Sequence, residues 1–331
     1  MKSVLVTGGD GFLGSNIVVE LLSRGYRVRV FAEPGRETPN LDGLDVDIVC
    51  GDIRSATDVS KGVEGCSYVI HTAASTSMWP SRSHLQREIN VVGTQNVIEA
   101  VLSRGVERMI HIGTANSFGP GSKDHPGHEE KPYIGSRYNL GYIDTKREAQ
   151  KLVIDAAQNR GLPGIVAAPT FMIGPNDSKP GSGQLIIAVV EKSIPGYAKG
   201  GKNYVYVKDV ATAVSNALDS GRIGESYILG NANLFYEEFF SIVAENSGAR
   251  MPKIAFPSFV VKATGLFGSL CGTIFRSTPK VTLPMARLSV EAHFYSPAKA
   301  VSELGLPQTP IGTAVTEAID WFRAHGYLPL A

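Results

Sequence analysis

The sequence has few cysteines, almost no net charge and no long apolar run. Its three cysteines, Cys50, Cys66 and Cys271, are an odd number without Cys-x-x-Cys spacing, so we expect neither a disulfide framework nor a zinc site. The net charge is +1 and the basic residues are scattered, which gives no reason to expect nucleic acid as a partner. Sparse cysteine is typical of a reducing compartment, so we expect a cytoplasmic protein.

Targeting and membrane-spanning signals are also weak. After Lys2 the first apolar run is too short for a signal peptide. Residues 254–275 are apolar, but a proline, a lysine and several glycines interrupt them more often than a membrane span tolerates. We expect a buried helix or a lid helix there, with attachment to a surface as the open alternative.

What the sequence does contain is an alternation of strand and helix patterns. Hydrophobic residues make up 43% of the chain and charged residues 19%, enough to bury a large core. Helical periodicity follows the first strand and recurs at 85–102 and 142–159. Short β-branched runs predict strands at 3–7, 27–31, 46–50, 68–72, 108–113 and 164–168. This α/β alternation predicts a doubly wound parallel sheet covered on both faces.

The regular alternation of predicted strands and helices ends after residue 168. Residues 170–203 are rich in Gly, Pro, Ser and Lys, which predicts an irregular lobe. A helix at 210–218, capped by Asp209, and a strand at 226–229 come next, and helical patterns continue to 313–324. We expect one domain from 1–169, to which 204–230 return, and a smaller, mostly helical lobe from 170–203 and 231–331.

A glycine-rich turn follows the first predicted strand and precedes a helix. Glycine permits positive φ and a close approach of the backbone to a pyrophosphate, and a helix N-terminus offers N–H groups and a positive dipole end to that anion. In this strand–turn–helix context the pattern predicts a dinucleotide site. Its binding residues are Thr7, Gly8, Gly11, Phe12, Leu13 and Gly14.

The residues after the second strand bear on the choice between NAD and NADP. A carboxylate there binds the ribose 2′-OH of NAD, whereas an arginine binds the 2′-phosphate of NADP. The chain offers both, as Glu33 and Arg36. Glu33 favours NAD because it would repel a 2′-phosphate, but the choice stays open at this stage.

The third and fourth strands end in further candidates for the cofactor site. Asp52 could accept a hydrogen bond from the adenine amino group, with Ile53 against the ring. Ala73 and Ala74 are small enough for a ring or a ribose to pass close to the backbone.

A tyrosine and a lysine lie four residues apart on one predicted helix. A cation close to the phenol of Tyr142 favours the phenolate, so Lys146 would lower a pKa that is ordinarily about 10 and let Tyr142 exchange a proton with a carbinol oxygen. The fifth strand ends at Thr114, which we expect to orient the substrate oxygen, with Ser117 as the alternative.

These motifs resemble those of the extended short-chain dehydrogenases/reductases, the NAD-dependent epimerase/dehydratase superfamily. The TGxxGxxG pattern matches Thr7 to Gly14, and YxxxK matches Tyr142 to Lys146. Asn90 matches the helix asparagine that supports the proton relay in that family, and the resemblance covers nearly the whole chain. It implies a Rossmann-type fold, and we expect Tyr142 and Lys146 to contact the cofactor as well, with Lys146 holding the ribose.

Residues 169–175 are similar to the dihydroflavonol-reductase-like branch, which is related to the 3β-hydroxysteroid dehydrogenases. The resemblance implies a cofactor contact at Pro169 and an oxidoreductase acting on a ketone or secondary alcohol of a bulky, hydrophobic compound. The chain departs from the family at Thr114, where serine is commoner, and at Gly141, where proline is usual.

Substrate contacts are expected from apolar and hydroxyl-bearing residues of 75–79, 171–184 and 254–275. The named candidates are Ser75, Thr76, Asn116, Ser117, Phe171 and Met172. One alternative is a nucleotide-sugar epimerase or dehydratase that retains NAD through turnover, and another is a redox sensor without catalysis. We expect a small-molecule substrate, no transmembrane segment and no metal, and a homodimer is left open.

Overall fold

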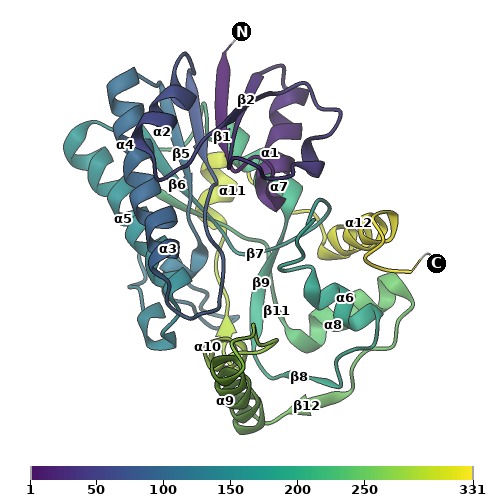
Figure 1. Cartoon of the computed structure of the whole chain (residues 1–331). Helices are drawn as coiled ribbons and strands as arrows, with labels where there is room; N and C mark the ends of the chain where they lie inside the picture. Colours follow the sequence, from purple (N-terminus) through teal and green to yellow (C-terminus); the bar gives the residue numbers. More distant parts are fainter. Residues whose placement is uncertain (1, 330–331) are drawn as a thin grey trace.

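The computed structural model describes residues 2–329, and a seven-stranded parallel sheet forms the centre of its larger part (Figure 1). The strand order is β10-β6-β5-β4-β1-β2-β3. The strands are β1 (Ser3–Thr7), β2 (Arg27–Ala32), β3 (Asp47–Cys50), β4 (Tyr68–His71), β5 (Arg108–Ile112), β6 (Gly164–Pro169) and β10 (Ser226–Leu229). The predicted Rossmann-type α/β fold is confirmed.

Successive residues of the central strands enter two separate cores, because side chains alternate between the faces of a sheet. On β1, Val4 and Val6 join one core and Leu5 joins the other, and all three are fully buried. One face is covered by α1 (Phe12–Ser23), α7 (Val207–Asn216) and α11 (Ala298–Leu304). The other is covered by α2 (Ala56–Val63), α4 (Gly93–Arg104) and α5 (Gly141–Arg160).

The smaller lobe combines a second sheet with five helices, below the main sheet in Figure 1. Its four strands are β7 (Phe171–Ile173), β9 (Gly201–Tyr206), β11 (Ala232–Phe235) and β13 (Ala292–His293), and β8 (Gly196–Ala198) pairs separately with β12 (Ile254–Phe256). The helices are α6 (Gln184–Val190), α8 (Tyr236–Ser247), α9 (Ser258–Ile274), α10 (Leu283–Ser289) and α12 (Ile311–Ala324).

The helix predicted at 85–102 has a less regular geometry than expected. It consists of α3 (His84–Arg87), a π-helical turn η2 (Glu88–Val92) and α4. Short 3-10 turns occur elsewhere, as η1 (Pro39–Leu41), η3 (Ala115–Ser117) and η4 (Gly135–Tyr138). Isolated π turns are frequent at functional sites.

Three predictions made from the sequence need correction. Residues 170–203 are not wholly irregular, because β7, α6, β8 and part of β9 form within them. Asp209 does not cap α7, since it lies inside the first turn and accepts hydrogen bonds from the backbone and hydroxyl of Thr309 at 2.8 and 2.7 Å. The expected helix within 254–275 forms as α9, but it is not buried, because only its glycines Gly265 and Gly272 are shielded. No helix among residues 2–329 is long and apolar enough to cross a membrane.

Candidate functional site

The glycine-rich turn is a backbone cradle at the carboxyl end of β1. Gly8 has φ +69°, and its carbonyl accepts a hydrogen bond from the Gly11 N–H at 3.1 Å. A Cβ on Gly14 would lie 2.2 Å from the same carbonyl oxygen, so only glycine allows helix and turn to pack this closely. The first turn of α1 begins at Phe12 with no side-chain cap and no acidic residue. The turn therefore fits the pyrophosphate of a dinucleotide, with the N–H groups of Phe12 and Leu13 at the helix start.

Thr7 lies beneath this turn and connects it to the neighbouring strand. Its hydroxyl lies 2.8 Å from His71 Nδ1 and 3.3 Å from the backbone N–H of Ala73. The other ring nitrogen of His71 lies 3.1 Å from the Thr94 hydroxyl, and burial lowers the pKa of this imidazole to about 3. His71 is therefore neutral, and Thr7 holds in position the backbone that leads to Ala74. Sequence reasoning missed this arrangement.

At the predicted adenine end, the candidate side chains are paired with one another. The Arg36 guanidinium forms an ion pair with the buried carboxylate of Asp10, in the glycine-rich turn, and lies 3.9 Å from the exposed Glu33 carboxylate. Asp52 accepts hydrogen bonds from the Arg54 backbone and guanidinium, and that interaction holds the pKa of Asp52 below its ordinary value. The buried Ile53 packs against Gly93 at the start of α4.

The ends of β5 and α5 bring the predicted reactive groups together. Tyr142 lies in the first turn of α5, and Lys146, one turn later, donates a hydrogen bond to the carbonyl of Ile112 at the end of β5. Thr114 follows two residues beyond that carbonyl, and its hydroxyl interacts with the phenol of Tyr142 and accepts from the Asn116 N–H at 3.3 Å. The structure thus brings Thr114, Tyr142 and Lys146 to one place.

Burial changes the proton affinities of both titratable groups. It raises the pKa of the Tyr142 phenol above 10.0, and the hydrogen bond with Thr114 partly opposes this effect. Burial lowers the pKa of Lys146 to about 8, because removal from water destabilises the ammonium relative to the neutral amine. The free protein therefore holds Tyr142 protonated at neutral pH.

Asn90 lies in the π-helical turn and is 2% exposed. Its Oδ1 accepts a hydrogen bond from the Ser75 N–H at 2.7 Å, and its Nδ2 donates to the Ser75 carbonyl at 3.0 Å. The same Nδ2 lies 3.0 Å from the Thr145 hydroxyl on α5. Asn90 therefore joins the segment of Ser75 and Thr76 to the helix that carries Tyr142.

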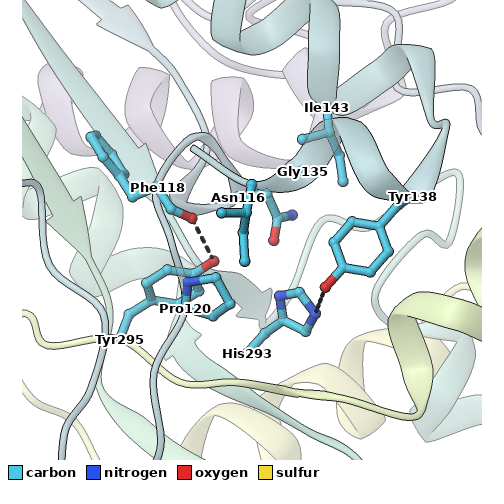
Figure 2. A pocket seen from close by; sticks show the side chains of 9 residues that line it. Asn116, Phe118, Pro120, Gly135, Tyr138, Ile143, His293 and Tyr295 are labelled. Atoms are coloured by element: carbon cyan, nitrogen blue, oxygen red, sulfur yellow. Dashed lines mark hydrogen bonds between the residues drawn. The ribbon is translucent and has the colours of Figure 1, made fainter. Parts of the chain in front are cut away.

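A narrow pocket next to Tyr142 is lined by residues from distant parts of the chain (Figure 2). Asn116 and Ile143 line it beside Thr114 and Tyr142, whereas Ser117 is buried with its hydroxyl lacking a partner among the described residues. The polar groups of the opposite wall are Tyr138 and His293, whose Oη and Nε2 atoms lie 3.3 Å apart. Sequence reasoning missed both, since 155 positions separate them and no motif marks either.

The substrate candidates on β7 lie where the chain leaves the main sheet. Pro169 ends β6, and Phe171 and Met172, both partly buried, begin the smaller sheet. The ammonium of Lys202 lies 4.9 Å from the centre of the Phe171 ring. Lys202 forms no ion pair within residues 2–329, and burial lowers its pKa to about 8. Besides Lys146, Lys202 is therefore a second lysine near the candidate site, and no sequence motif marks it.

Comparison with known sequences extends over nearly the whole chain. The family described as NAD dependent epimerase/dehydratase matches residues 4–230. A Synechocystis protein named "Putative dihydroflavonol 4-reductase" is 30% identical, with 98% of this chain and 95% of that protein covered. Sterol demethylase protein B of Methylococcus capsulatus is 29% identical, with 98% of this chain and 100% of that protein covered.

Solved structures agree with the fold and the cofactor class. The crystal structure of gox2253 superposes with a TM-score of 0.87 at 32% identity, covering 99% of this chain and 100% of that chain. The Thermus thermophilus UDP-glucose 4-epimerase in complex with NAD superposes with a TM-score of 0.77 at 25% identity, covering 97% and 99% of the two chains.

Proposed function

Because the chain belongs to the NAD-dependent epimerase/dehydratase family and is an NAD(P)-dependent oxidoreductase of the extended short-chain dehydrogenase/reductase type, we propose that it interconverts a ketone and a secondary alcohol on a bulky, hydrophobic small molecule. In this proposal, residues 1–169 and most of 204–230, together with α11 on the same sheet, hold the dinucleotide. The smaller lobe, from 170–203 with the rest of β9 and most of 231–331, holds the substrate.

The observation that carries the proposal is the contact of Tyr142 with Thr114, together with the position of Lys146 one helical turn after Tyr142 and at the end of the strand that leads to Thr114. In the reducing direction, Tyr142 donates its proton to the carbonyl oxygen while Thr114 donates a hydrogen bond to the same oxygen. Lys146 supplies a positive charge that stabilises the phenolate left on Tyr142. A nicotinamide dinucleotide in the glycine cradle supplies or accepts the hydride.

Apolar side chains near the reactive groups support a hydrophobic substrate. Phe118, Ile134 and Ile143 lie there with the polar side chains of Tyr138 and His293, around a hollow too small to admit a substrate without rearrangement. Two relatives also carry the names of a dihydroflavonol reductase and a sterol demethylase protein.

A second candidate function is epimerisation or dehydration of a nucleotide sugar, which Lys202 favours. A partly desolvated ammonium without a carboxylate partner suits a phosphate group, and such a group occurs in nucleotide sugars. A solved structural relative is named as a UDP-glucose 4-epimerase.

The test measures how fast the reduced cofactor is oxidised in the presence of each class of candidate substrate. Purified protein is supplied with NADH or NADPH and a panel of flavonoid, steroid and aliphatic ketones, and oxidation of the reduced cofactor is followed by absorbance. We expect turnover of a ring ketone with free cofactor in excess. Release of stoichiometric NAD on denaturation, together with conversion of a UDP- or GDP-sugar, would instead establish the second function.

Three variants test whether Tyr142 and Thr114 take part in the proposed reaction. Tyr142→Phe removes the proton donor and should lower kcat by at least about a hundredfold while changing cofactor affinity much less. Thr114→Ser keeps the hydroxyl and should stay active, whereas Thr114→Val should lose most activity. Unchanged turnover in Tyr142→Phe would show that the proton comes from another group.

A further inference from the structure

We propose that α9 (Ser258–Ile274) docks this protein onto an anionic lipid surface, with the helix lying in the plane of the membrane interface. The helix lies at the end of the smaller lobe, beyond α10 from the main sheet (Figure 1). Three features carry the proposal, namely its packing through glycines, its exposed aromatic residues and its uniformly positive charge.

The face of α9 that contacts the rest of the protein is made of small residues. A Cβ on Gly265 would lie 2.5 Å from the Ala286 Cβ, and one on Gly268 would lie 2.2 Å from the Val281 carbonyl oxygen. Gly272 likewise lies against Pro279. These glycines recur at helical spacing, so the helix packs on α10 and the loop before it through its backbone rather than its large side chains.

The opposite face carries the large apolar side chains, and they point to solvent. Phe259 is 74% exposed, Phe267 69% and Ile274 70%. With Leu266 and Leu270, at 48% and 53%, they lie within an arc of about 100° around the helix. A helix of a globular protein ordinarily buries such a stripe, so an exposed one marks an interaction surface.

The charge of the surrounding segment identifies the kind of partner. Residues 249–290 contain six basic residues and not one aspartate or glutamate. All six are exposed, and none forms an ion pair within residues 2–329. They are Arg250, Lys253, Lys262, Arg276, Lys280 and Arg287. An apolar stripe flanked by unpaired cations matches a bilayer with acidic headgroups, where the apolar side chains enter the interface and the cations meet the lipid phosphates.

The same charges argue against a second copy of the chain as the occupant of this face. Two-fold association places a patch against the same patch of its partner. Here it would bring two groups of unpaired cations together, with no acidic residue between positions 249 and 290 to neutralise them.

The experiment is co-sedimentation of the full chain with vesicles of phosphatidylcholine alone and with added phosphatidylglycerol. We expect binding to the anionic vesicles at least about tenfold stronger than to the neutral ones, and weaker binding as salt is raised. The triple variant Phe259→Ser, Phe267→Ser, Ile274→Ser should lose at least about tenfold in binding. Lys262→Gln combined with Arg276→Gln and Lys280→Gln removes three of the six cations and should reduce the salt dependence by about half.

The control is Val19→Ser with Ile223→Ser, which removes two side chains of 45% and 46% exposure outside this segment and should bind vesicles like the wild type. NAD-induced thermal stabilisation in every variant reports that the fold and the dinucleotide site persist. Absence of wild-type binding to anionic vesicles would overturn the proposal. So would a concentration-dependent dimer, seen by analytical ultracentrifugation, that the triple serine variant abolishes. Neither result bears on turnover, so docking and the proposed function are tested separately.

Discussion

Asn90 Nδ2 lies 3.0 Å from the hydroxyl of Thr145, and this contact joins the π-helical turn η2 to the helix that carries the reactive tyrosine. Thr145 lies between Tyr142 and Lys146 in sequence, and its hydroxyl also donates to the Gly141 carbonyl at 2.8 Å. The usual proline is absent at position 141, so these contacts help to hold the entry of α5 in place.

Replacing Asn90 tests this role. Asn90→Ala leaves the Ser75 N–H without its side-chain partner, whereas the Ser75 carbonyl still accepts from Gln86 Nε2 at 3.3 Å, and an unpaired buried group costs about 1–3 kcal/mol. We expect a lower free energy of unfolding in urea and a fall in kcat larger than the rise in KM, because Asn90 positions α5 without touching substrate. Thr145→Ser keeps the hydroxyl and serves as the control. An unchanged kcat in Asn90→Ala would disprove the positioning role.

Lys146 should destabilise the folded protein at neutral pH. Burial lowers its pKa from 10.5 to about 8, so the unfolded chain binds more protons than the folded one between those values, and the stability contributed by this group rises with pH across that window. At about 1.4 kcal/mol for each tenfold change in proton affinity, the cost is about 3 kcal/mol below pH 8. Replacing the buried cation removes that cost but also the hydrogen bond to Ile112.

Lys146→Met should therefore raise the free energy of unfolding by about 1–3 kcal/mol near pH 7, while abolishing turnover. The gain should shrink steadily as the pH rises above about 8. Urea denaturation without cofactor at several pH values measures it. Lys151→Met, an exposed lysine on the same helix, is the control and should change stability little at any pH. A gain in Lys146→Met that is independent of pH would contradict the argument.

The glycine cradle admits a steric test. A Cβ on Gly14 would lie 2.2 Å from the Gly8 carbonyl oxygen and 2.8 Å from the Gly9 Cα, so Gly14→Ala must shift backbone at the turn. We expect at least about a hundredfold weaker dinucleotide binding by isothermal titration, with residual folding monitored by circular dichroism. Gly181→Ala meets no atom within 4 Å and should bind normally.

The pairing of Arg36 with Asp10 and Glu33 bears on the choice between NAD and NADP. Removing the Glu33 charge leaves Arg36 freer to meet a 2′-phosphate, so Glu33→Gln should raise the affinity for NADP relative to NAD by about fivefold, or about 1 kcal/mol. Arg36→Ala should lower the same ratio. Cofactor titrations of both variants, with Glu37→Gln as the control, measure it. Equal ratios of NADP to NAD affinity in the wild type and the three variants would show that neither Glu33 nor Arg36 determines the choice of cofactor.

Most of the main sheet could be predicted from the sequence, because each of its strands is a short apolar run bounded by turn residues. The predicted strands at 3–7 and 226–229 match β1 and β10 in full, and the others differ by one residue at an end. The strands within residues 170–203 were harder to predict. β7 and β9 are short and form because they pair with each other, and β9 also pairs with β11. Such pairing depends on contacts between distant segments, which local periodicity does not record.

The residues of the candidate site also divide into those that the sequence could predict and those that it could not. Tyr142, Lys146 and Thr114 could be found because motif spacing places them at the ends of adjacent elements. Lys202 and His293 could not, because their position beside the pocket arises from the pairing of β9 with β13. Of the alternatives expected for residues 254–275, the buried helix is wrong for a related reason, since hydrophobic composition does not tell which face of a helix contacts the protein.

The side chain of Asn40 connects the glycine turn to the smaller lobe. Its Nδ2 lies 3.2 Å from the Asp10 carbonyl, 3.0 Å from the Asn176 carbonyl and 3.0 Å from the Ser178 hydroxyl. The amide nitrogen of Asn40 carries two hydrogens, so it can donate to only two of these three acceptors at a time. This one amide therefore links the glycine turn to residues 176 and 178, so a substitution at Asn40 would affect the cofactor turn and the substrate lobe together.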